Sequence, residues 1–297
     1  MTAPTWFTRS IAAPASDRTT TVEECDIHWL DWAGPSPDAP GLVFVHGGAA
    51  HAHWFSFVAP MFTHQWHVAA LDLSGHGDSG HRDRYDYQTW AAEIVAVSEA
   101  AGFPGPPVIV GHSMGGTVTT ALAAHHPAAV AGAIIVDALV SRPDAESEAA
   151  SRGRTFRAPG VYDTFDEALG HFRLIPPQPA SNPFILDHIA RHSLHETDRG
   201  WTWKFDPHVF DRARVLLGAD QVRSVTTRVA LLRGEHSVVV PPDVAEYLYG
   251  LLGRVAPVVT VPESHHHVFV DQPLAFITAI RALLQDWDHS SPRRPPT

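Results

Sequence analysis

The sequence predicts an α/β protein with a mostly parallel, doubly wound sheet and an inserted helical cap. Short apolar runs suited to buried strands recur up to residue 136 and again after residue 228. Segments with apolar residues at helical spacing separate these runs, which is the βαβ pattern of a parallel sheet with right-handed crossovers. Between residues 141 and 215 no run typical of a buried strand occurs. This segment contains prolines, aromatic residues and helix-start signals, and the alternation of strand and helix patterns is interrupted.

The first 140 residues predict alternating strands and helices. Residues 1–20 are rich in Thr, Ala and Pro and are expected to form a leading arm, whereas the alternating residues 25–32 predict an outer strand. Four apolar runs predict buried strands, at residues 42–45, 67–72, 107–110 and 131–136. Two segments predict helices, at residues 89–102 and 117–126. These elements begin a core domain that we expect to span residues 1–140 and 216–297.

Residues 141–215 predict a separate module, the cap. Thr164 and Glu167 have the spacing of a capping box, with apolar residues on one face of the helix that follows. Asn182 followed by Pro183 predicts the start of another helix, which continues to about residue 193.

After the cap the strand and helix rhythm returns. Two apolar runs predict strands, at residues 229–232 and 258–261, with a helix near 242–252 between them. Apolar residues at helical spacing from Phe276 to Trp287 predict a final helix. The proline-rich residues 289–297 predict a frayed tail.

Composition excludes several classes of partner. The formal net charge is −11 and no basic stripe occurs, which argues against nucleic acid. Cys25 is the single cysteine, so neither a disulfide framework nor a cysteine-rich metal site is expected. No apolar run reaches the length of a signal peptide core or a membrane span, so we expect a cytoplasmic protein with no membrane partner.

The pattern Gly111-His112-Ser113-Met114-Gly115 lies between a predicted buried strand and a predicted helix. In that context Gly-x-Ser-x-Gly predicts a nucleophile elbow, in which a strained turn lifts the serine hydroxyl to the top of the sheet. Glycine on both sides removes the side chains that would collide where strand and helix meet. Ser113 is therefore the candidate nucleophile.

A serine nucleophile requires a base, a group that orients the base, and donors for the oxyanion. The backbone N–H of Met114 is one expected donor, because it follows the nucleophile at the helix start. The N–H of Gly48 is the other, because His46-Gly47-Gly48 forms a turn directly after a predicted strand. Glycines there allow a substrate to approach the main chain.

Together with a late histidine after the last strand, the motifs at residues 46–48 and 111–116 resemble the α/β-hydrolase superfamily over roughly residues 25–288. The resemblance implies the chain order serine, acid, histidine. Counting back from Gln272-Pro273 places His266 at the catalytic position, and His265 is the chief alternative base. The run 265–267 contains three histidines, but adjacent residues cannot easily aim three imidazoles at one ion, so no metal is expected.

The acid departs from the family pattern. Members commonly carry an aspartate in a Gly-Glu-x-Asp turn after the strand that matches residues 228–233, but Ser237 occupies that position here. Asp137, at the end of the strand that follows the nucleophile helix, is the first candidate. Glu235 is the alternative acid, and a Ser–His dyad without an acid remains open.

These features predict a serine hydrolase that cleaves a carboxylic ester or lactone of a small, hydrophobic molecule through an acyl-enzyme, with no organic cofactor or metal. The alternatives are a C–C bond hydrolase that uses the same residues and a catalytically silent ligand-binding protein. We expect four residues to contact the substrate, namely Gly47, His112, Trp201 and Trp203. The sequence does not predict the oligomeric state.

Overall fold

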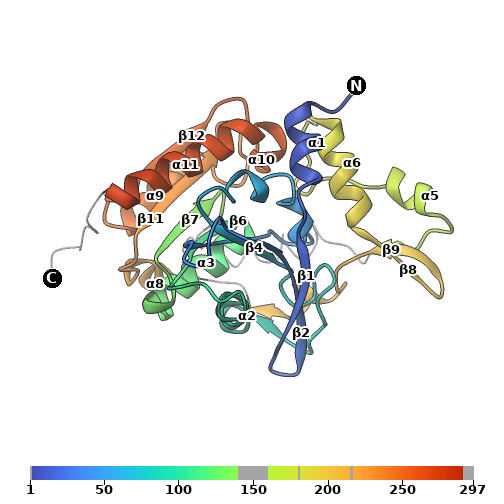
Figure 1. Cartoon of the computed structure of the whole chain (residues 1–297), viewed down its shortest axis with the longest axis horizontal. Helices are drawn as coiled ribbons and strands as arrows, with labels where there is room; N and C mark the ends of the chain where they lie inside the picture. Colours follow the sequence, from blue (N-terminus) through green and yellow to red (C-terminus); the bar gives the residue numbers. More distant parts are fainter. Residues whose placement is uncertain (1, 140–159, 180, 215–216, 290–297) are drawn as a thin grey trace.

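The computed structural model describes residues 2–139, 160–179, 181–214 and 217–289 (Figure 1). Within them, eight strands form one sheet in the order β1-β2-β4-β3-β6-β7-β11-β12. All pairs from β4 to β12 are parallel, and the first two pairs are antiparallel. The strands are β1 (Ser16–Val22), β2 (Cys25–Trp32), β3 (Gly41–Val45), β4 (His67–Leu71), β6 (Val108–His112), β7 (Gly132–Val136), β11 (Val229–Gly234) and β12 (Val258–Val261). The predicted mostly parallel α/β sheet is confirmed.

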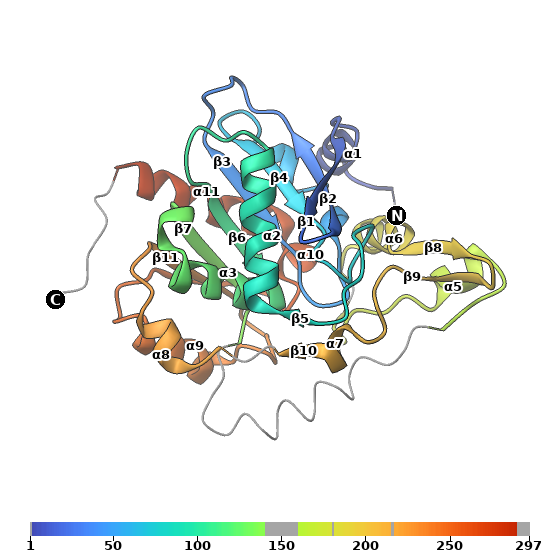
Figure 2. The same cartoon turned by 90° about the horizontal axis from the view of Figure 1, so that it is seen from below.

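Helices cover both faces of the sheet (Figure 2). Buried residues of four helices pack on one face, namely α2 (Tyr87–Ala100), α3 (Met114–His125), α8 (Ala219–Arg223) and α9 (Pro242–Leu251). The other face is covered by α1 (Thr5–Ile11), α10 (Val268–Asp271) and α11 (Pro273–His289). The described residues also contain three short turns of 3₁₀ helix, namely η1 (Ala52–Trp54), η2 (Ala59–Met61) and η3 (Pro127–Ala129).

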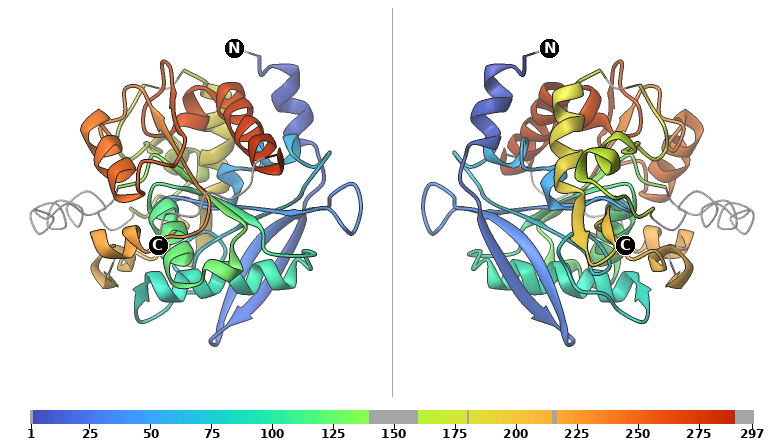
Figure 3. Two further views of the ribbon diagram at one scale, coloured as in Figure 1. Left: turned by 90° about the vertical axis from the view of Figure 1, so that its left-hand side faces the viewer. Right: turned by 90° about the vertical axis from the view of Figure 1, so that its right-hand side faces the viewer.

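The expectation that residues 1–20 form a leading arm was wrong. They form α1 and β1, and β1 pairs along its whole length with β2 at the edge of the sheet (Figure 3, blue). Phe7 is only 3% exposed and contacts the rings of Phe57 and Phe184, which anchors α1. Most residues of β1 are exposed and only Val22 is buried, so its sequence is polar and lacks the apolar pattern of a buried strand. Of the expected frayed tail, residues 290–297 lie outside the described part of the chain, and α11 ends at His289.

The described part of the cap contains both predicted helices and a hairpin that was not expected. Thr164 caps α5 (Phe165–Gly170), and Pro183 begins α6 (Pro183–His192). Strands β8 (Leu194–Thr197) and β9 (Gly200–Trp203) form the hairpin, which lies beside α5 away from the main sheet in Figures 1 and 2. The chain then returns through α7 (Val209–Arg212) and β10 (Ala213–Arg214), which pairs with β5 (Tyr85–Asp86). The rest of the expected cap, residues 141–159, lies outside the described residues.

Candidate active site

Ser113 lies in a tight turn between β6 and α3. Its φ of 53° is in the left-handed region, which is strained for a residue with a side chain. A Cβ added to Gly111 would lie 2.3 Å from the Thr119 hydroxyl, and one on Gly115 would lie 2.4 Å from the His46 carbonyl oxygen. Only glycine allows the helix to approach the strand ends this closely, as the sequence predicted.

The hydroxyl of Ser113 is the first member of a continuous hydrogen-bond chain. Its Oγ lies 3.0 Å from Nε2 of His266, and Nδ1–H of the same ring donates to Oδ1 of Asp137 over 2.8 Å. Asp137 follows β7 directly, as Ser113 follows β6, and the two strands are neighbours in the sheet. Both His266 and Asp137 are buried. A buried chain from hydroxyl through imidazole to carboxylate can transfer a proton from the serine as it attacks a carbonyl.

Two further donors hold the carboxylate of Asp137. The backbone N–H of Gly234 donates to Oδ2 over 2.8 Å, and the Ser237 hydroxyl donates to Oδ1 over 2.5 Å. The Ser237 oxygen in turn accepts from the backbone N–H groups of Val239 and Val240. Ser237 therefore orients the acid. Sequence reasoning missed this role of Ser237. The position of Ser237, where the resemblance predicts an aspartate, could have indicated that its side chain lies beside the histidine and its acid.

The alternative base and acid lie elsewhere. The ring of His265 and its backbone N–H both donate to Oδ2 of Asp271, over 3.0 and 2.8 Å. The carboxylate of Glu235 is half exposed and accepts from the backbone N–H of Glu263 over 2.9 Å. The structure therefore brings His266 and Asp137 to Ser113, and gives His265 and Glu235 other partners.

The turn after β3 lies against the elbow, because a Cβ on Gly47 would be 3.1 Å from the Cβ of Ser113. The buried ring of His46 is held at both nitrogens. Its Nε2 accepts from the Leu73 N–H over 3.0 Å, so its Nδ1–H donates to the Gly47 carbonyl over 2.7 Å. That carbonyl belongs to the same planar peptide as the Gly48 N–H, so His46 also sets the direction of this N–H.

Comparison with known proteins agrees with this geometry. Residues 40–177 match the model of the α/β hydrolase fold family. An esterase of Mycobacterium tuberculosis is 30% identical over 263 residues, which make up 86% of this chain and 85% of that protein. The chain belongs to the α/β hydrolase family.

Other α/β hydrolases are similar over most of the chain. A pimeloyl-[acyl-carrier protein] methyl ester esterase of Neisseria meningitidis is 27% identical over 84% of this chain and 95% of its own. The solved structure of E-2-(acetamidomethylene)succinate hydrolase superposes with a TM-score of 0.80 at 21% identity, covering 92% of this chain and all of that one. A structure of the M. tuberculosis esterase, an enzyme that transition metals inhibit, has a TM-score of 0.71 and 26% identity over 91% of this chain and 92% of that one. Among the described residues of this hydrolase, no helix combines the length and apolar character needed to span a membrane.

His112 is the last residue of β6 and directly precedes Ser113. The ring is 2% exposed, and its Nε2–H donates to the carbonyl oxygen of His266 over 3.0 Å. Burial, and next the neighbouring His266, hold the pKa of His112 well below its usual value, so the ring is neutral at physiological pH. The ring therefore supports the backbone of the loop that carries His266, and the expected contact with substrate stays a prediction.

Trp201 and Trp203 pack within the described part of the cap. The ring of Trp201 meets Phe165 edge-on with centroids 5.0 Å apart, and the ring of Trp203 contacts Phe172 at 5.8 Å. Both partners come from α5 and the residues just after it. These contacts stabilise the hairpin against the helix, so the expected role in substrate binding has no support from the position of the two rings.

Two cap residues hold the loop that carries His266. Oε1 of Gln178 accepts from the backbone N–H of His267 over 2.9 Å. The side-chain amide of Asn182 donates to the carbonyls of Val270 and Asp271, each over 2.9 Å. The cap therefore fixes the position of the base in this hydrolase, which the sequence did not indicate.

Proposed function

We propose that this α/β hydrolase cleaves a carboxylic ester of a small, hydrophobic molecule through an acyl-enzyme on Ser113. The observation that carries the proposal is the hydrogen-bond chain from Ser113 through His266 to Asp137, with links of 3.0 and 2.8 Å. Relatives named as esterases support the ester bond as the target. A lactone presents the same carbonyl group to the nucleophile and belongs to the same proposal.

In the first half-reaction, Oγ of Ser113 attacks the carbonyl carbon while Nε2 of His266 takes its proton. Asp137 accepts from Nδ1–H, which keeps the other nitrogen free as a base and stabilises the imidazolium that forms. His266 then gives the proton to the leaving alcohol. In the second half-reaction, water loses a proton to His266 and attacks the acyl-serine, and the serine recovers its proton as the acid leaves.

The tetrahedral intermediate requires donors for its negative oxygen. We assign them to the backbone N–H groups of Gly48 and Met114, at the turn after β3 and the start of α3. Two observations support this assignment, namely the close approach of Gly47 to Ser113 and the hold that His46 has on the Gly47–Gly48 peptide. Losing one such donor costs about 10²–10³ in kcat in other serine hydrolases.

We also propose that residues 141–215 form a cap inserted into a core of residues 1–140 and 216–297. The described part, residues 160–214, lies mostly outside the main sheet and contacts the catalytic-histidine loop through Gln178 and Asn182. A cap in this position encloses the acyl or alcohol part of a substrate, which favours hydrophobic esters.

Covalent labelling by a fluorophosphonate tests the nucleophile, and a panel of p-nitrophenyl esters, lactones and a 1,3-diketone tests the reaction. Labelling of the wild type, its loss in Ser113→Ala, and hydrolysis of the esters are expected, with kcat of the variant lower by several orders of magnitude. An unlabelled wild type would indicate the silent ligand-binding alternative. Turnover of the diketone without turnover of any ester would indicate a C–C bond hydrolase.

A further inference from the structure

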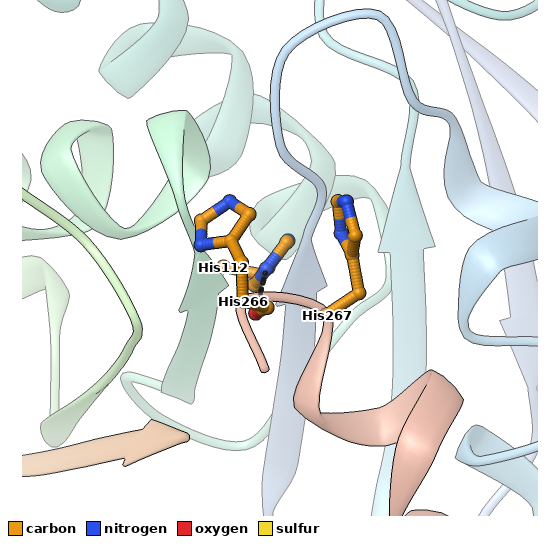
Figure 4. A group of neighbouring side chains, drawn as sticks. All are labelled: His112, His266 and His267. Carbon is orange, nitrogen blue, oxygen red and sulfur yellow. Dashed lines mark hydrogen bonds between the residues drawn. The ribbon is translucent and has the colours of Figure 1, made fainter. Parts of the chain in front are cut away.

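Three histidines from two parts of the chain meet beside Ser113. His112 comes from the end of β6, and His266 and His267 come from the loop before α10; Figure 4 shows the His266 side chain between the other two. One ring nitrogen of each lies within 4.8 Å of a ring nitrogen of the other two. Sequence reasoning set aside a metal because it considered only the adjacent histidines 265–267, whereas the structure replaces His265 with His112.

Two of these rings donate one N–H to an acceptor. Nδ1–H of His266 donates to Asp137, and Nε2–H of His112 donates to the His266 carbonyl. The carbonyl of Ile175 lies beside the His267 ring, although neither ring nitrogen makes a hydrogen bond of normal geometry. A histidine that binds a metal almost always donates its other N–H to a carboxylate or a backbone carbonyl. The hydrogen bonds of His112 and His266 therefore match those of metal-binding histidines.

The remaining nitrogens are available. Among the described residues, Nδ1 of His112 and both nitrogens of His267 are buried without a hydrogen-bond partner, and Nε2 of His266 has only the Ser113 hydroxyl. Buried polar atoms without partners are rare in folded proteins and need an explanation, such as a bound ion. Another described group could hold an ion and is formed by His28, Asp72 and Asp78. It differs because both ring nitrogens of His28 are already hydrogen-bonded to carboxylates.

We propose that these three imidazoles, from His112, His266 and His267, form a site for a divalent transition metal such as Zn²⁺ or Cu²⁺, which inhibits the enzyme when it binds. Imidazole nitrogens are preferred ligands of both ions. In a tetrahedral Zn²⁺ site the nitrogens lie roughly 3.3 Å apart, given Zn–N bonds of about 2.0–2.1 Å. The nitrogens, which lie within 4.8 Å of one another, therefore need to converge by up to about 1.5 Å.

Binding exchanges ligands without a change in protonation. Three neutral nitrogens enter the coordination sphere, one water molecule keeps the fourth position of a tetrahedral site, and the other water molecules of the hydrated ion are released. The second nitrogen of each ring keeps its proton. The lone pair on Nε2 of His266 is then used by the ion, so the Ser113 hydroxyl loses its acceptor. Inhibition, unlike binding, rests on the proposed function, because it requires His266 to be the base.

Binding is tested first without substrate. The full-length, untagged chain is stripped with EDTA, and its affinity for Zn²⁺ is measured by competition with a chromophoric chelator; Co²⁺ serves as a spectroscopic probe of tetrahedral nitrogen ligation. His267→Phe is expected to raise the Kd at least about tenfold and to remove the Co²⁺ spectrum. His265→Phe, a change at the neighbouring histidine that contacts Asp271, is the matched control and should keep the Kd within about twofold.

Additional variants and an activity assay complete the test. His267→Gln replaces His267→Phe if the latter fails to fold, and Ser113→Ala should bind Zn²⁺ at least as tightly as wild type. Equal affinity in the wild type and both His267 variants, no tight Zn²⁺ site in the wild type, or loss of binding in Ser113→Ala would each overturn the three-histidine assignment. In activity assays, EDTA-reversible inhibition at concentrations near the measured Kd is expected. Zn²⁺ binding by a wild type that hydrolyses no ester would leave the metal site intact and refute the proposed function instead.

Discussion

The hydroxyl of Ser237 and the side chain of His266 donate to the same oxygen of Asp137, over 2.5 and 2.8 Å. Ser237 stands at the position where the resemblance to α/β hydrolases predicts an acid, and here it donates to Asp137, which follows a neighbouring strand. With the Gly234 N–H on the second oxygen, the carboxylate has three donors that fix its orientation. Hydrogen bonds on both oxygens keep this carboxylate directed at His266.

Asp137→Asn should lower kcat by about three to four orders of magnitude, because the amide can no longer stabilise the imidazolium or select its tautomer. Glu235→Gln should lower kcat by about tenfold or less, since Glu235 contacts the backbone of Glu263 and not His266. Steady-state kinetics on a p-nitrophenyl ester measures both. An inactive Glu235→Gln enzyme with an active Asp137→Asn enzyme would reverse the assignment, and two active variants would indicate a dyad.

Ser237→Asp should partly restore the activity of Asp137→Asn. The Ser237 oxygen is already in contact with the oxygen that receives Nδ1–H, so a longer carboxylate at residue 237 can reach the imidazole. We expect at least about tenfold recovery of kcat over Asp137→Asn alone. Ser237→Asn in the same background is the uncharged control and should restore nothing. As a single change, Ser237→Asp should reduce kcat, because two carboxylates would then repel each other.

The contact between α6 and the core should weaken in acid. Burial, and next the neighbouring His192, lower the pKa of His53 and of His188 from 6.5 to about 3 and about 4. Nε2 of His188 lies 2.7 Å from the Ser56 hydroxyl, and the ring of His53 stacks on that of His192. Below about pH 6.5 the unfolded chain binds protons that the folded chain does not bind, so stability falls as pH decreases toward these folded values.

The expected loss of unfolding free energy is about 1.4 kcal/mol per pH unit for each such histidine. Urea unfolding at several pH values between 7 and 4.5 measures it. His188→Gln should give a shallower dependence than wild type, whereas His126→Gln, at an exposed histidine, should follow the wild-type curve. Identical curves for wild type and His188→Gln would show that His188 does not contribute.

Trp203→Ala should destabilise the cap without changing which esters are cleaved. The ring contacts Phe172 and Tyr162, so its loss removes packing within the cap. We expect a loss of about 1–3 kcal/mol for this half-buried side chain and a ratio of kcat/KM between butyrate and decanoate esters within about twofold of wild type. Thermal unfolding and the two kinetic constants measure this. A large change in the ratio at unchanged stability would place the ring in the substrate site.

Much of the fold was predictable because the strands are buried on both faces. The runs that became β3, β6 and β7 are fully buried and continuously apolar, so their sequences stand out from their surroundings. The pattern failed at β1, most of whose residues are exposed, and at the hairpin β8–β9, whose alternating aromatic residues did not identify it as a strand pair.

The candidate site was predictable where local sequence determines geometry. The elbow depends on glycines adjacent to Ser113, and the position of His266 follows from its spacing to Pro273. The choice between Asp137 and Glu235 could not be decided from the sequence, because both follow strands of the same sheet edge and differ only in the direction of the side chain. The partnership of His112 with His267 depends on residues about 155 positions apart, and no local pattern reports such a contact.

The division of the catalytic residues along the chain has a consequence for biosynthesis. Ser113 and Asp137 belong to one continuous β-strand–helix–strand unit, whereas the Gly234 N–H that holds Asp137 lies on β11, which pairs with β7, and His266 comes later still, after β12. Synthesis proceeds from the N-terminus, and domains generally fold as units. A chain that has emerged only as far as residue 139 therefore contains Ser113 and Asp137 but not His266, so the proposed base is absent until the second half of the sheet has been made.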